Sequence, residues 1–367
     1  MFENLQISVQ KNKSQPLYEQ LRNQLVDYIR SNKIEEGTQL PDIKTMGVMA
    51  GVSLRTVEQA YTMLIEDGFC FRRPKKGTFV GNLPFRERNE VRRICALFIP
   101  SNLLHFEEDK ILGSLYSGIQ MQAKKENVDI WILSEQSLPF YLNCPNLELL
   151  GVLMLYWRDI NAAVRIVRAY SKLRFVFMNY FLEGFESMAE NVYGVFNDDF
   201  AGGYEAAEFL LGRKHSKMKA FTINLKDCNY QQRIDGFLQA LANNRFDGRG
   251  VVCQFDNQEE PNEKELSNMG RTMMLQTLEN APETSAVFCV NDMIAAGAAK
   301  VLDERNLRNK IELLGYDNVF SYLSQQYGFS TIAVNFEQIG AKSMQLLAHP
   351  EGNYPKMLHI APRLIPR

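Results

Sequence analysis

Residues 53–56 combine short hydrogen-bonding side chains with a long cation at the start of a predicted helix. Two of them carry hydroxyls, and Arg55 carries a guanidinium group that can donate two parallel hydrogen bonds. Such groups distinguish base pairs when a helix places them in a DNA major groove. Farther along, cations and a glycine in a short turn suit a narrow groove or the phosphates beside it. The predicted contacts to DNA are Lys44, Ser53, Arg55, Thr56, Arg73, Lys75, Lys76 and Gly77.

A second group of polar residues follows the ends of apolar runs in the rest of the chain. Asn179, Asn291 and Asp317 each come directly after such a run, and Arg233 lies at the start of a helical pattern. Asp, Asn and Arg make directed hydrogen bonds to hydroxyls, and Tyr or Trp supplies a flat apolar face, so this is the chemistry of sugar binding. Taken singly, each residue could instead only cap the next helix. The predicted effector contacts are Arg233, Asn291, Asp317, Asn179, Tyr180, Trp157, Lys110 and Tyr230.

The residues before and after the first group contain the helix starts and ends that are typical of a helix-turn-helix. Pro16 opens a helix whose apolar residues recur at helical spacing. Asp42 is placed to cap a second, short helix that runs to about residue 50. Gly51 then turns the chain into a capping serine, and a third helix ends at Gly68. The third helix is the one that can enter a major groove.

A β-hairpin with a cationic tip is predicted directly after the third helix. Residues 69–71 and 78–80 are two short apolar runs on either side of that tip. By themselves Lys75 and Lys76 would indicate only a solvated turn. Attached to a helix-turn-helix, they indicate a wing that contacts DNA.

From residue 94 onward, apolar runs typical of buried strands alternate with helical patterns. The predicted strands are 94–99, 129–133, 151–156, 174–178, 219–223, 250–254, 286–290 and 312–316. The predicted helices are 112–126, 162–170, 202–211, 231–243, 269–278 and 294–304. Buried strands separated by helices predict parallel sheets with helices on both faces. The number of strands exceeds one comfortable sheet, so two lobes with a ligand cleft at the strands' carboxyl ends are expected.

Composition fits a nucleic-acid-binding head joined to a different kind of body. The chain has 367 residues, of which 46% are apolar and 23% charged, and a net charge of −2. Residues 1–93 hold 15 Lys and Arg against 11 Asp and Glu, a net charge of +4, whereas the remainder holds 26 against 32, a net of −6. A basic head on an acidic body favours DNA as the partner of the head alone.

Several other function classes find no support in the residues. The six cysteines contain no CxxC pair and the four histidines show no metal spacing, so neither a zinc site nor a disulfide framework is expected. The chain has no glycine-rich phosphate loop and no cofactor lysine in a recognisable context, so no cofactor and no enzyme activity are predicted. The first residues lack a secretory pattern and no stretch reaches the length of a membrane span, which predicts a cytoplasmic protein without a membrane partner.

The head resembles the DNA-binding domain of the GntR family over about residues 14–81. The matching segments, in order, are 16–18, 40–41, 52–57, 64–68 and 76–80. The chain departs from the family pattern at Lys44, where the family has Arg, and at Leu54, where an Arg commonly follows the capping serine. Lys44 keeps the cation without the guanidinium fork, so the operator sequence is expected to differ from the family's common one.

The body resembles the effector domain of the LacI/GalR family, itself similar to periplasmic sugar-binding proteins, over about residues 93–367. The matching segments are 198–203, 233–237, 290–297, 314–318, 330–332 and 363–367. The resemblance implies that Arg233, Asn291 and Asp317 hold sugar hydroxyls. Val334 stands where many members have a glutamine contact. The combination of head and body resembles arabinose-repressor-like regulators.

These observations predict a winged helix-turn-helix joined to a two-lobed, periplasmic-binding-protein-like α/β domain. The expected boundaries are 1–82 for the head, 83–93 for a linker and 94–367 for the effector and dimerisation domain. Such a chain would bind a palindromic operator in double-stranded DNA as a homodimer and act as a repressor released by a monosaccharide such as arabinose or fucose. The alternative is a GntR-type head fused to an enzyme-like body. In the first lobe, Trp157 is either a stacking platform for the sugar or a packing residue.

Overall fold

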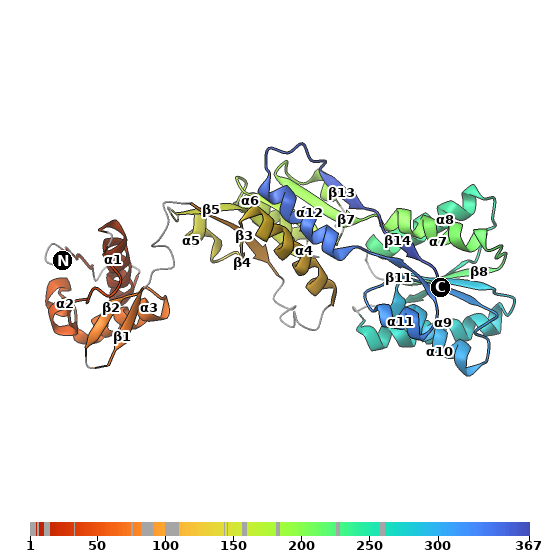
Figure 1. Cartoon of the computed structure of the whole chain (residues 1–367), viewed down its shortest axis with the longest axis horizontal. Coiled ribbons are helices and arrows are strands. Elements are labelled where there is room, and N and C mark those ends of the chain that lie inside the picture. The colour runs from red at the N-terminus through yellow and green to blue at the C-terminus, as the bar shows by residue number, and fades with distance from the viewer. Residues whose placement is uncertain are drawn as a thin grey trace. The chain divides into compact units, whose positions relative to one another are not determined.

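The protein is described by a computed structural model, and two compact units are present, Met1–Val91 and Arg92–Arg367 (Figure 1). The structure describes residues 5, 7–10, 15–32, 34–74, 76–81, 91–99, 110–142, 144, 146–155, 160–180, 184–224, 228–256 and 261–367. Lys75, Trp157 and most of the predicted linker 83–93 lie outside the described residues, so the proposed roles of these parts stay predictions. Within the described residues, no helix combines the length and apolar character that crossing a membrane requires.

The first unit has three helices followed by a two-stranded hairpin. Its elements are α1 (Leu17–Ser31), α2 (Ile43–Ala50), α3 (Leu54–Glu66), β1 (Cys70–Arg73) and β2 (Gly77–Val80). Asp42 caps α2 by accepting from the backbone N–H groups of Lys44 and Thr45, and Gly51 ends this helix in a left-handed conformation with φ of 62°. The apolar faces of the helices meet in one core around Leu21, Leu25, Val57 and Leu64. The predicted winged helix-turn-helix is confirmed.

The second unit has two lobes, each built on a six-stranded sheet. The sheet of the first lobe has the strand order β13-β7-β6-β5-β3-β4, with every neighbouring pair parallel. Its strands are β3 (Arg92–Phe98), β4 (Asp129–Ile132), β5 (Leu147–Leu155), β6 (Arg174–Met178), β7 (Val192–Asn197) and β13 (Met357–Ile360). Its helices are α4 (Lys110–Glu126), α5 (Leu138–Leu142), α6 (Ile160–Ala169) and α12 (Phe336–Ala348), with a short 3-10 turn η2 (Phe185–Ser187).

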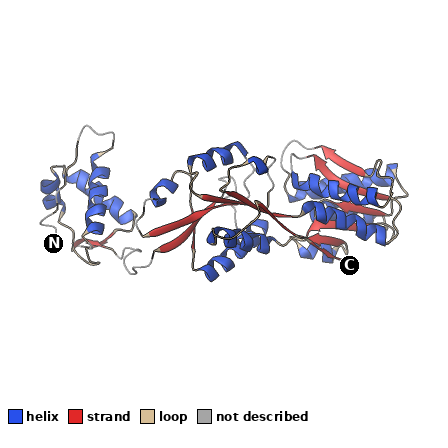
Figure 2. Cartoon of the chain, turned by 90° about the horizontal axis from the view of Figure 1, so that it is seen from above, coloured by secondary structure: helices blue, strands red, loops and turns tan. Residues whose placement is uncertain are grey.

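Alternation along the strands gives the first lobe two apolar layers. Successive side chains of a strand point to opposite faces, so Cys95 and Leu97 pack with α4 and α12 while Ala96 and Phe98 pack with α6. Both faces of the sheet are therefore covered by helices, and Figure 2 shows helices on either side of the strands. Because both faces of each strand are buried, the strands appear in the sequence as continuous apolar runs.

The second lobe has the strand order β14-β12-β11-β10-β8-β9, in which only the β12–β14 pair is antiparallel. Its strands are β8 (Met218–Asn224), β9 (Val252–Asp256), β10 (Ala286–Cys289), β11 (Glu312–Asp317), β12 (Ser330–Ala333) and β14 (Arg363–Ile365). Its helices are α7 (Asp199–Gly212), α8 (Cys228–Asn243), α9 (Glu263–Asn280), α10 (Asp292–Glu304) and α11 (Ser321–Gln326). In Figure 1, α7 and α8 lie on one face of the sheet and α9 and α10 on the other.

The described chain passes between the lobes at 197–199, 333–336 and 360–363. The Asp198 N–H donates to the Ile360 carbonyl at 2.9 Å, which joins two of these crossings. The Val334 N–H donates to the Asp317 carbonyl at 3.1 Å and ties the third crossing to the end of β11. The crossings therefore run beside the carboxyl ends of the strands, where the predicted effector residues lie.

The predicted fold class is confirmed, and the structure corrects several details of the element pattern. All eight predicted strands are present, but β7, β12, β13 and β14 were not predicted as strands. Helix α9 begins at Glu263, capped by Asn262, and not near residue 269. Helix α12 follows β12 in sequence but packs in the first lobe, which is a long-range exchange that periodicity cannot predict.

Candidate functional site

The start of α3 carries an exposed cation on a tightly capped helix. The Ser53 hydroxyl accepts from the Thr56 N–H at 3.2 Å, and the two hydroxyls are 2.8 Å apart. Both predicted hydroxyl donors are thus used in building the helix start. Arg55 is exposed, and among the described residues its side chain has no ion pair or hydrogen bond. Of the residues at this helix start, Arg55 is therefore the one best able to reach a base edge.

Helix α2 supports the position of α3 and presents Lys44 to solvent. The Tyr61 hydroxyl of α3 donates to the Pro41 carbonyl at 2.7 Å, directly before α2 begins. Hydrogen bonds from the Thr45 backbone and hydroxyl, together with the Lys44 N–H, hold the pKa of Asp42 below its usual value. The cap therefore stays ionised, and the Lys44 side chain lies exposed in the first turn of α2.

The wing is held by aromatic stacking and by one side chain from outside it. The guanidinium of Arg73 lies 5.2 Å from the ring centroid of Phe71 and 5.1 Å from that of Phe79. Gln39 donates from its side-chain amide to the Lys76 carbonyl at 2.8 Å, next to Gly77. Arg73 is thereby fixed along the wing, whereas the Lys76 side chain lies exposed at its tip.

Two exposed apolar side chains near the α2–α3 turn were not among the predicted DNA contacts. Val48 is 84% exposed and Leu54 is 51% exposed. Leu54 is the residue that departs from the family pattern, and its position one residue before Arg55 puts it on the same helix start. An apolar side chain at such a position suits the methyl group of thymine.

In the second unit, a buried guanidinium group connects three structural elements at the junction of the lobes. Arg233 of α8 donates from Nε to Asp199 at 2.7 Å and from Nη1 to the Val290 carbonyl at 2.6 Å. Its Nη2 lies 2.8 Å from the carboxylate of Asp317 at the end of β11. Burial lowers the pKa of Arg233, but Asp199 and Asp317 together raise it well above its usual value. The group is a permanent cation between two carboxylates.

Close packing of α7 on α8 fixes this arginine. A Cβ atom on Gly203 of α7 would lie 1.9 Å from the Arg233 carbonyl oxygen, and one on Gly202 would lie 2.0 Å from the Tyr316 hydroxyl. The Arg233 guanidinium lies 3.8 Å from the ring centroid of Tyr316. The glycine pair therefore has a packing reason, because any side chain there would displace the stacked Arg233–Tyr316 pair.

Asn291 is both a helix cap and a member of the site. Its side-chain oxygen accepts from the Ile294 N–H at 2.8 Å, and its amide donates to the Tyr230 hydroxyl at 2.8 Å. Tyr230 also lies against Arg233, with 5.4 Å between the guanidinium and the ring centroid. Asn291 therefore caps α10, as the alternative interpretation expects, and Arg233, Tyr230, Asn291 and Asp317 lie together, while the binding role of Asn291 stays a prediction.

The carboxyl group of Asp292 next to this site is deeply buried. It accepts from the Thr331 hydroxyl at 2.7 Å and from the Asn318 N–H at 2.9 Å. Burial raises the pKa of Asp292 to about 8, with nearby Asp317 acting in the same direction. Below that pH the Asp292 carboxyl is neutral, so it links the start of α10 to β12 and to the residue after β11 without adding a charge to the site.

The first lobe contributes its backbone to the same place. Asn229 of α8 donates to the Asn179 carbonyl at 3.1 Å and to Asp199 at 2.7 Å. Asn179 follows β6 with a left-handed φ of 67°, which turns its carbonyl toward the second lobe. Tyr180 packs against the core of the first lobe. Thus Asn179 lies at the junction as predicted, whereas Tyr180 has a packing role in this structure.

Lys110 lies at the junction of the lobes but contacts aromatic rings. Its Nζ is 4.7 Å from the ring centroid of Phe320 and 5.6 Å from that of Tyr322, both in the second lobe. Lys110 begins α4 of the first lobe, so this cation–π contact joins the lobes.

Three polar residues at this junction were not predicted from the sequence. Asp199 accepts from Arg233, from Asn229 and from the Asn197 amide at 2.8 Å. The side-chain oxygens of Asn197 and Asn318 are buried without a hydrogen-bond partner in the described structure. Such atoms are costly to bury and favour a polar ligand at this place. The only sequence sign was the Asp198-Asp199 pair at a helix start, where capping is the ordinary explanation.

The described part of the chain was searched for side chains that could form a metal centre. Groups of three or more His, Cys, Asp or Glu side chains close enough to bind a metal ion do not occur there. The site around Arg233 contains amides, carboxylates, a guanidinium and phenol groups, all of which can form hydrogen bonds with a polar ligand.

Comparison with known proteins gives two family matches. Residues 17–80 match the bacterial regulatory proteins of the gntR family, and residues 207–367 match the periplasmic binding protein-like domain. The chain is 25% identical over 272 residues to a curated repressor of Mannheimia succiniciproducens named HTH-type transcriptional repressor PurR, covering 71% of this chain and 77% of that protein. Other curated repressors of this name match over about half of their length.

Solved structures share the fold. A complex of the transcriptional regulator CelR with cellobiose has a TM-score of 0.58 at 18% identity and covers 89% of this chain and 98% of its own. A LacI family regulator from Enterococcus faecium with bound ribose has a TM-score of 0.55 at 20% identity, covering 74% and 96%. Both family matches describe regulatory or binding domains, so an enzyme-like body is not favoured. The chain thus combines a gntR-family helix-turn-helix with a periplasmic-binding-protein-like domain, and this combination supports a regulator of GntR/LacI type.

Proposed function

We propose that this regulator is a repressor of carbohydrate-utilisation genes that leaves its operator when a monosaccharide binds at the lobe junction. The observation that carries the proposal is the meeting of Arg233, Asn291, Asp317 and Tyr230 at the carboxyl ends of adjacent strands, beside the crossings between the lobes. Ligands of open α/β sheets bind at this edge. A ligand that contacts both lobes favours the closed arrangement of the lobes over the open one. Its binding can therefore change the conformation of the rest of the chain.

The charges at the junction favour a neutral sugar over a sugar phosphate. The guanidinium group of Arg233 faces the carboxylates of Asp199 and Asp317, so this group of three side chains is net negative. The cation of Lys110, also at the junction, lies against the rings of Phe320 and Tyr322. An added phosphate dianion would be repelled, whereas sugar hydroxyls can both donate to carboxylates and accept from the guanidinium and amides. Two solved regulators of this fold have cellobiose and ribose bound. Arabinose and fucose are the first candidates for this chain.

A homodimer is the expected form on DNA, and an apolar surface of the first lobe supports it. Ile132 of the edge strand β4 is 64% exposed and Phe140 of α5 is 51% exposed. The two elements are adjacent, because the rings of Trp131 and Tyr141 lie 5.2 Å apart. Exposed apolar side chains on an edge strand favour a surface that a second copy of the chain covers. A dimer would also bring together two heads with two-fold symmetry, which matches a palindromic operator. A protein that binds operator DNA must be in the compartment that contains the DNA, so we expect it in the cytoplasm.

The first test separates DNA binding from sugar binding. Operator sequences are selected from a random double-stranded DNA pool with the full chain, and the purified protein is then melted against a panel of free and phosphorylated monosaccharides. A ligand present at 100 times its dissociation constant adds about 2.7 kcal/mol of stability. The same sugar should weaken operator binding by roughly 5–150-fold. Stabilisation by a sugar without release from the selected DNA would contradict the repressor mechanism.

The variant Asp317→Asn tests the site itself. Asp317 has a φ of 91°, a conformation in which asparagine is tolerated, so the backbone should survive the change. We expect loss of the sugar response with operator affinity unchanged. The matched control is Asp247→Asn, which removes an exposed carboxylate that, among the described residues, pairs with Arg249. A retained sugar response in Asp317→Asn would put the effector site elsewhere.

A further inference from the structure

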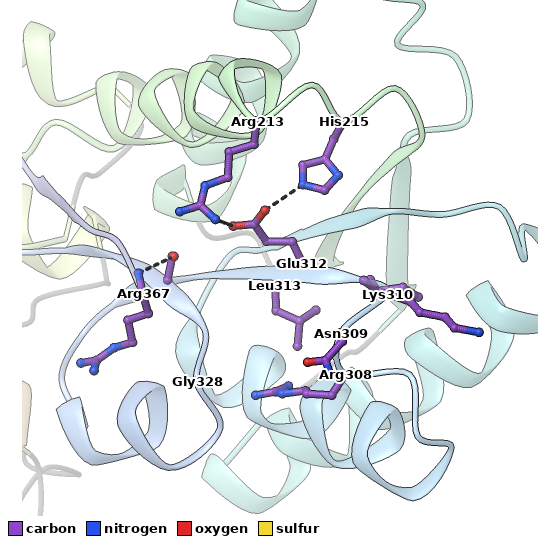
Figure 3. A pocket seen from close by; sticks show the side chains of 11 residues that line it. Arg213, His215, Arg308, Asn309, Lys310, Glu312, Leu313, Gly328 and Arg367 are labelled. Carbon is purple, nitrogen blue, oxygen red and sulfur yellow. Dashed lines mark hydrogen bonds and ion pairs between the residues drawn. The ribbon is translucent and has the colours of Figure 1, made fainter.

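A pocket lies at the opposite end of the second lobe's sheet from Arg233. It has a volume of about 380 Å³ and opens among the amino ends of β11 and β12 and the segment before β8 (Figure 3). Glu312 begins β11 and Asp317 ends it. At about 3.3 Å per residue, the two ends of this strand are roughly 17 Å apart. The pocket is therefore separate from the site at the lobe junction.

The side chains that line this pocket are mainly cationic. Arg213, Arg308, Lys310 and Arg367 line it together with one acidic side chain, that of Glu312. Glu312 is already neutralised, because Arg213 Nη1 lies 3.0 Å from one of its oxygens and His215 Nε2 lies 2.7 Å from the other. Figure 3 shows both of these side chains turned toward Glu312. The charges of the remaining cations are thus not balanced by Glu312.

Arg308 is held in the pocket with an unsatisfied donor. Its Nη2 is buried and has no hydrogen-bond partner in the described structure, while its Nε lies 3.6 Å from Asp303. A Cβ atom on Gly328 would lie 3.9 Å from Nη2, so the guanidinium faces the turn before β12. Burial lowers the pKa of Arg308, which reflects the cost of holding a cation there. An anion at Nη2 would supply the missing acceptor.

Arg367 approaches the same turn from the other side. Its backbone N–H donates to the Ser330 hydroxyl at 3.0 Å, two residues after Gly328. Its guanidinium is exposed, and among the described residues it has no ion pair. The Arg308 guanidinium and the backbone of Arg367 therefore both lie at the turn before β12, and both residues line the pocket.

We propose that this pocket binds a phosphate group, either inorganic phosphate or the phosphoryl group of a small metabolite, between Arg308 and Arg367. Guanidinium groups bind phosphate oxygens through paired, charge-assisted hydrogen bonds. The volume admits a small molecule and excludes a nucleic acid duplex. This pocket would bind an anion, whereas the site at the lobe junction is proposed to bind a neutral sugar. One chain would therefore bind two chemically different small molecules.

Calorimetric titration of the full chain with inorganic phosphate tests the proposal at fixed ionic strength and without DNA or sugar. We expect saturable binding of one phosphate per chain. Arg308→Gln and Arg367→Gln should each weaken it by about tenfold or more, since each removes a charge-assisted contact. Arg249→Gln is the matched control, because Arg249 is an exposed arginine of the same lobe that pairs with Asp247. Equal losses in all three variants would overturn the proposal.

A variant that should bind phosphate more tightly tests whether weaker binding in the other variants comes only from misfolding. Glu312→Gln releases Arg213 and His215 from their carboxylate partner, so phosphate should bind more tightly, by several-fold to about tenfold. Weaker binding in Glu312→Gln would contradict the assignment. Glycerol 3-phosphate binding more tightly than inorganic phosphate would indicate a phosphorylated metabolite, and the reverse order would indicate the free ion. Succinate binding as tightly as phosphate would refute selectivity for phosphate.

These titrations are independent of the proposed sugar response. Arg308 and Arg367 are at the far end of the strands from Asp317, and the sugar-dependent melting shift should persist in both glutamine variants. Loss of phosphate binding with an intact sugar response would assign the two ligands to two sites. Loss of both responses in Arg367→Gln, whose side chain is exposed, would refute a separate phosphate site.

Discussion

Replacing Asp199 with asparagine should destabilise the effector domain strongly. Asp199 is 1% exposed and accepts three hydrogen bonds of 2.7–2.8 Å, from Arg233, Asn229 and Asn197. Asparagine keeps the shape but removes the charge that balances Arg233, and its amide group would face other donors. Removing one partner of a buried ion pair costs about 3–5 kcal/mol. Asp317 still pairs with Arg233, so we expect a loss of free energy of unfolding near the lower end of that range.

The assay is equilibrium unfolding in urea, followed by tryptophan fluorescence and circular dichroism. The matched control is Asp198→Asn, one residue earlier, where the carboxylate accepts from the Ala201 N–H at 2.9 Å as a helix cap. Aspartate and asparagine cap almost equally well, so this control should lose no more than about 1 kcal/mol. A loss below about 1 kcal/mol in Asp199→Asn would refute the argument that this carboxylate balances a buried cation. Adding Arg233→Met to Asp199→Asn should cost less than the sum of the two single changes, by roughly 0.5–3 kcal/mol.

Arg55→Ala should weaken binding to the selected operator by about 1–3 kcal/mol and binding to unrelated DNA much less, which fluorescence anisotropy on both DNAs measures. Burial raises the pKa of Asp292 to about 8, so between about pH 4 and pH 8 the folded protein holds a proton that the unfolded chain has released. The free energy of unfolding should therefore fall as the pH rises from about 4 toward 8. Asp292→Asn should remove that decline, and urea unfolding at several pH values with identical pH dependence in both proteins would argue against it. Gly203→Ala should cost about 1–3 kcal/mol, since its Cβ would lie 1.9 Å from the Arg233 carbonyl oxygen. Gly212→Ala, where a Cβ meets no atom within 4 Å, should leave the melting temperature unchanged or raise it.

The head could be predicted almost completely because its structure depends on local chemistry. Asp42 and Gly51 determine where α2 begins and ends through contacts within a few residues of themselves. Ser53 caps α3 in the same way. The prediction was less complete for individual roles, because the stacking of Arg73 on Phe71 and Phe79 depends on the strand register of the hairpin. Spacing along the sequence does not specify which cations of a wing are held by rings.

The body could be predicted as strands and helices, but its division between lobes depends on contacts far apart in the chain. Helix α12 follows β12 of the second lobe and packs in the first, and β13 pairs with β7 of the first lobe. Both exchanges join segments separated by well over a hundred residues in the sequence, so no window of periodicity contains them. Asp199 was missed for the same reason: its partner Arg233 is 34 residues away and reaches it only after α7 and α8 have packed.

Asp199 also links the binding chemistry to the passage between lobes. It lies in the crossing 197–199, and the same residue accepts from Arg233, the cation that the proposed sugar would contact. A sugar hydroxyl that engages Arg233 must therefore join or replace hydrogen bonds made by the crossing itself. Under the proposed function, sugar binding would therefore change contacts of a segment that connects the two lobes. If the proposed sugar binds at Arg233, it needs no long chain of intermediate residues to act on the crossing 197–199, because Asp199 of that crossing already contacts Arg233.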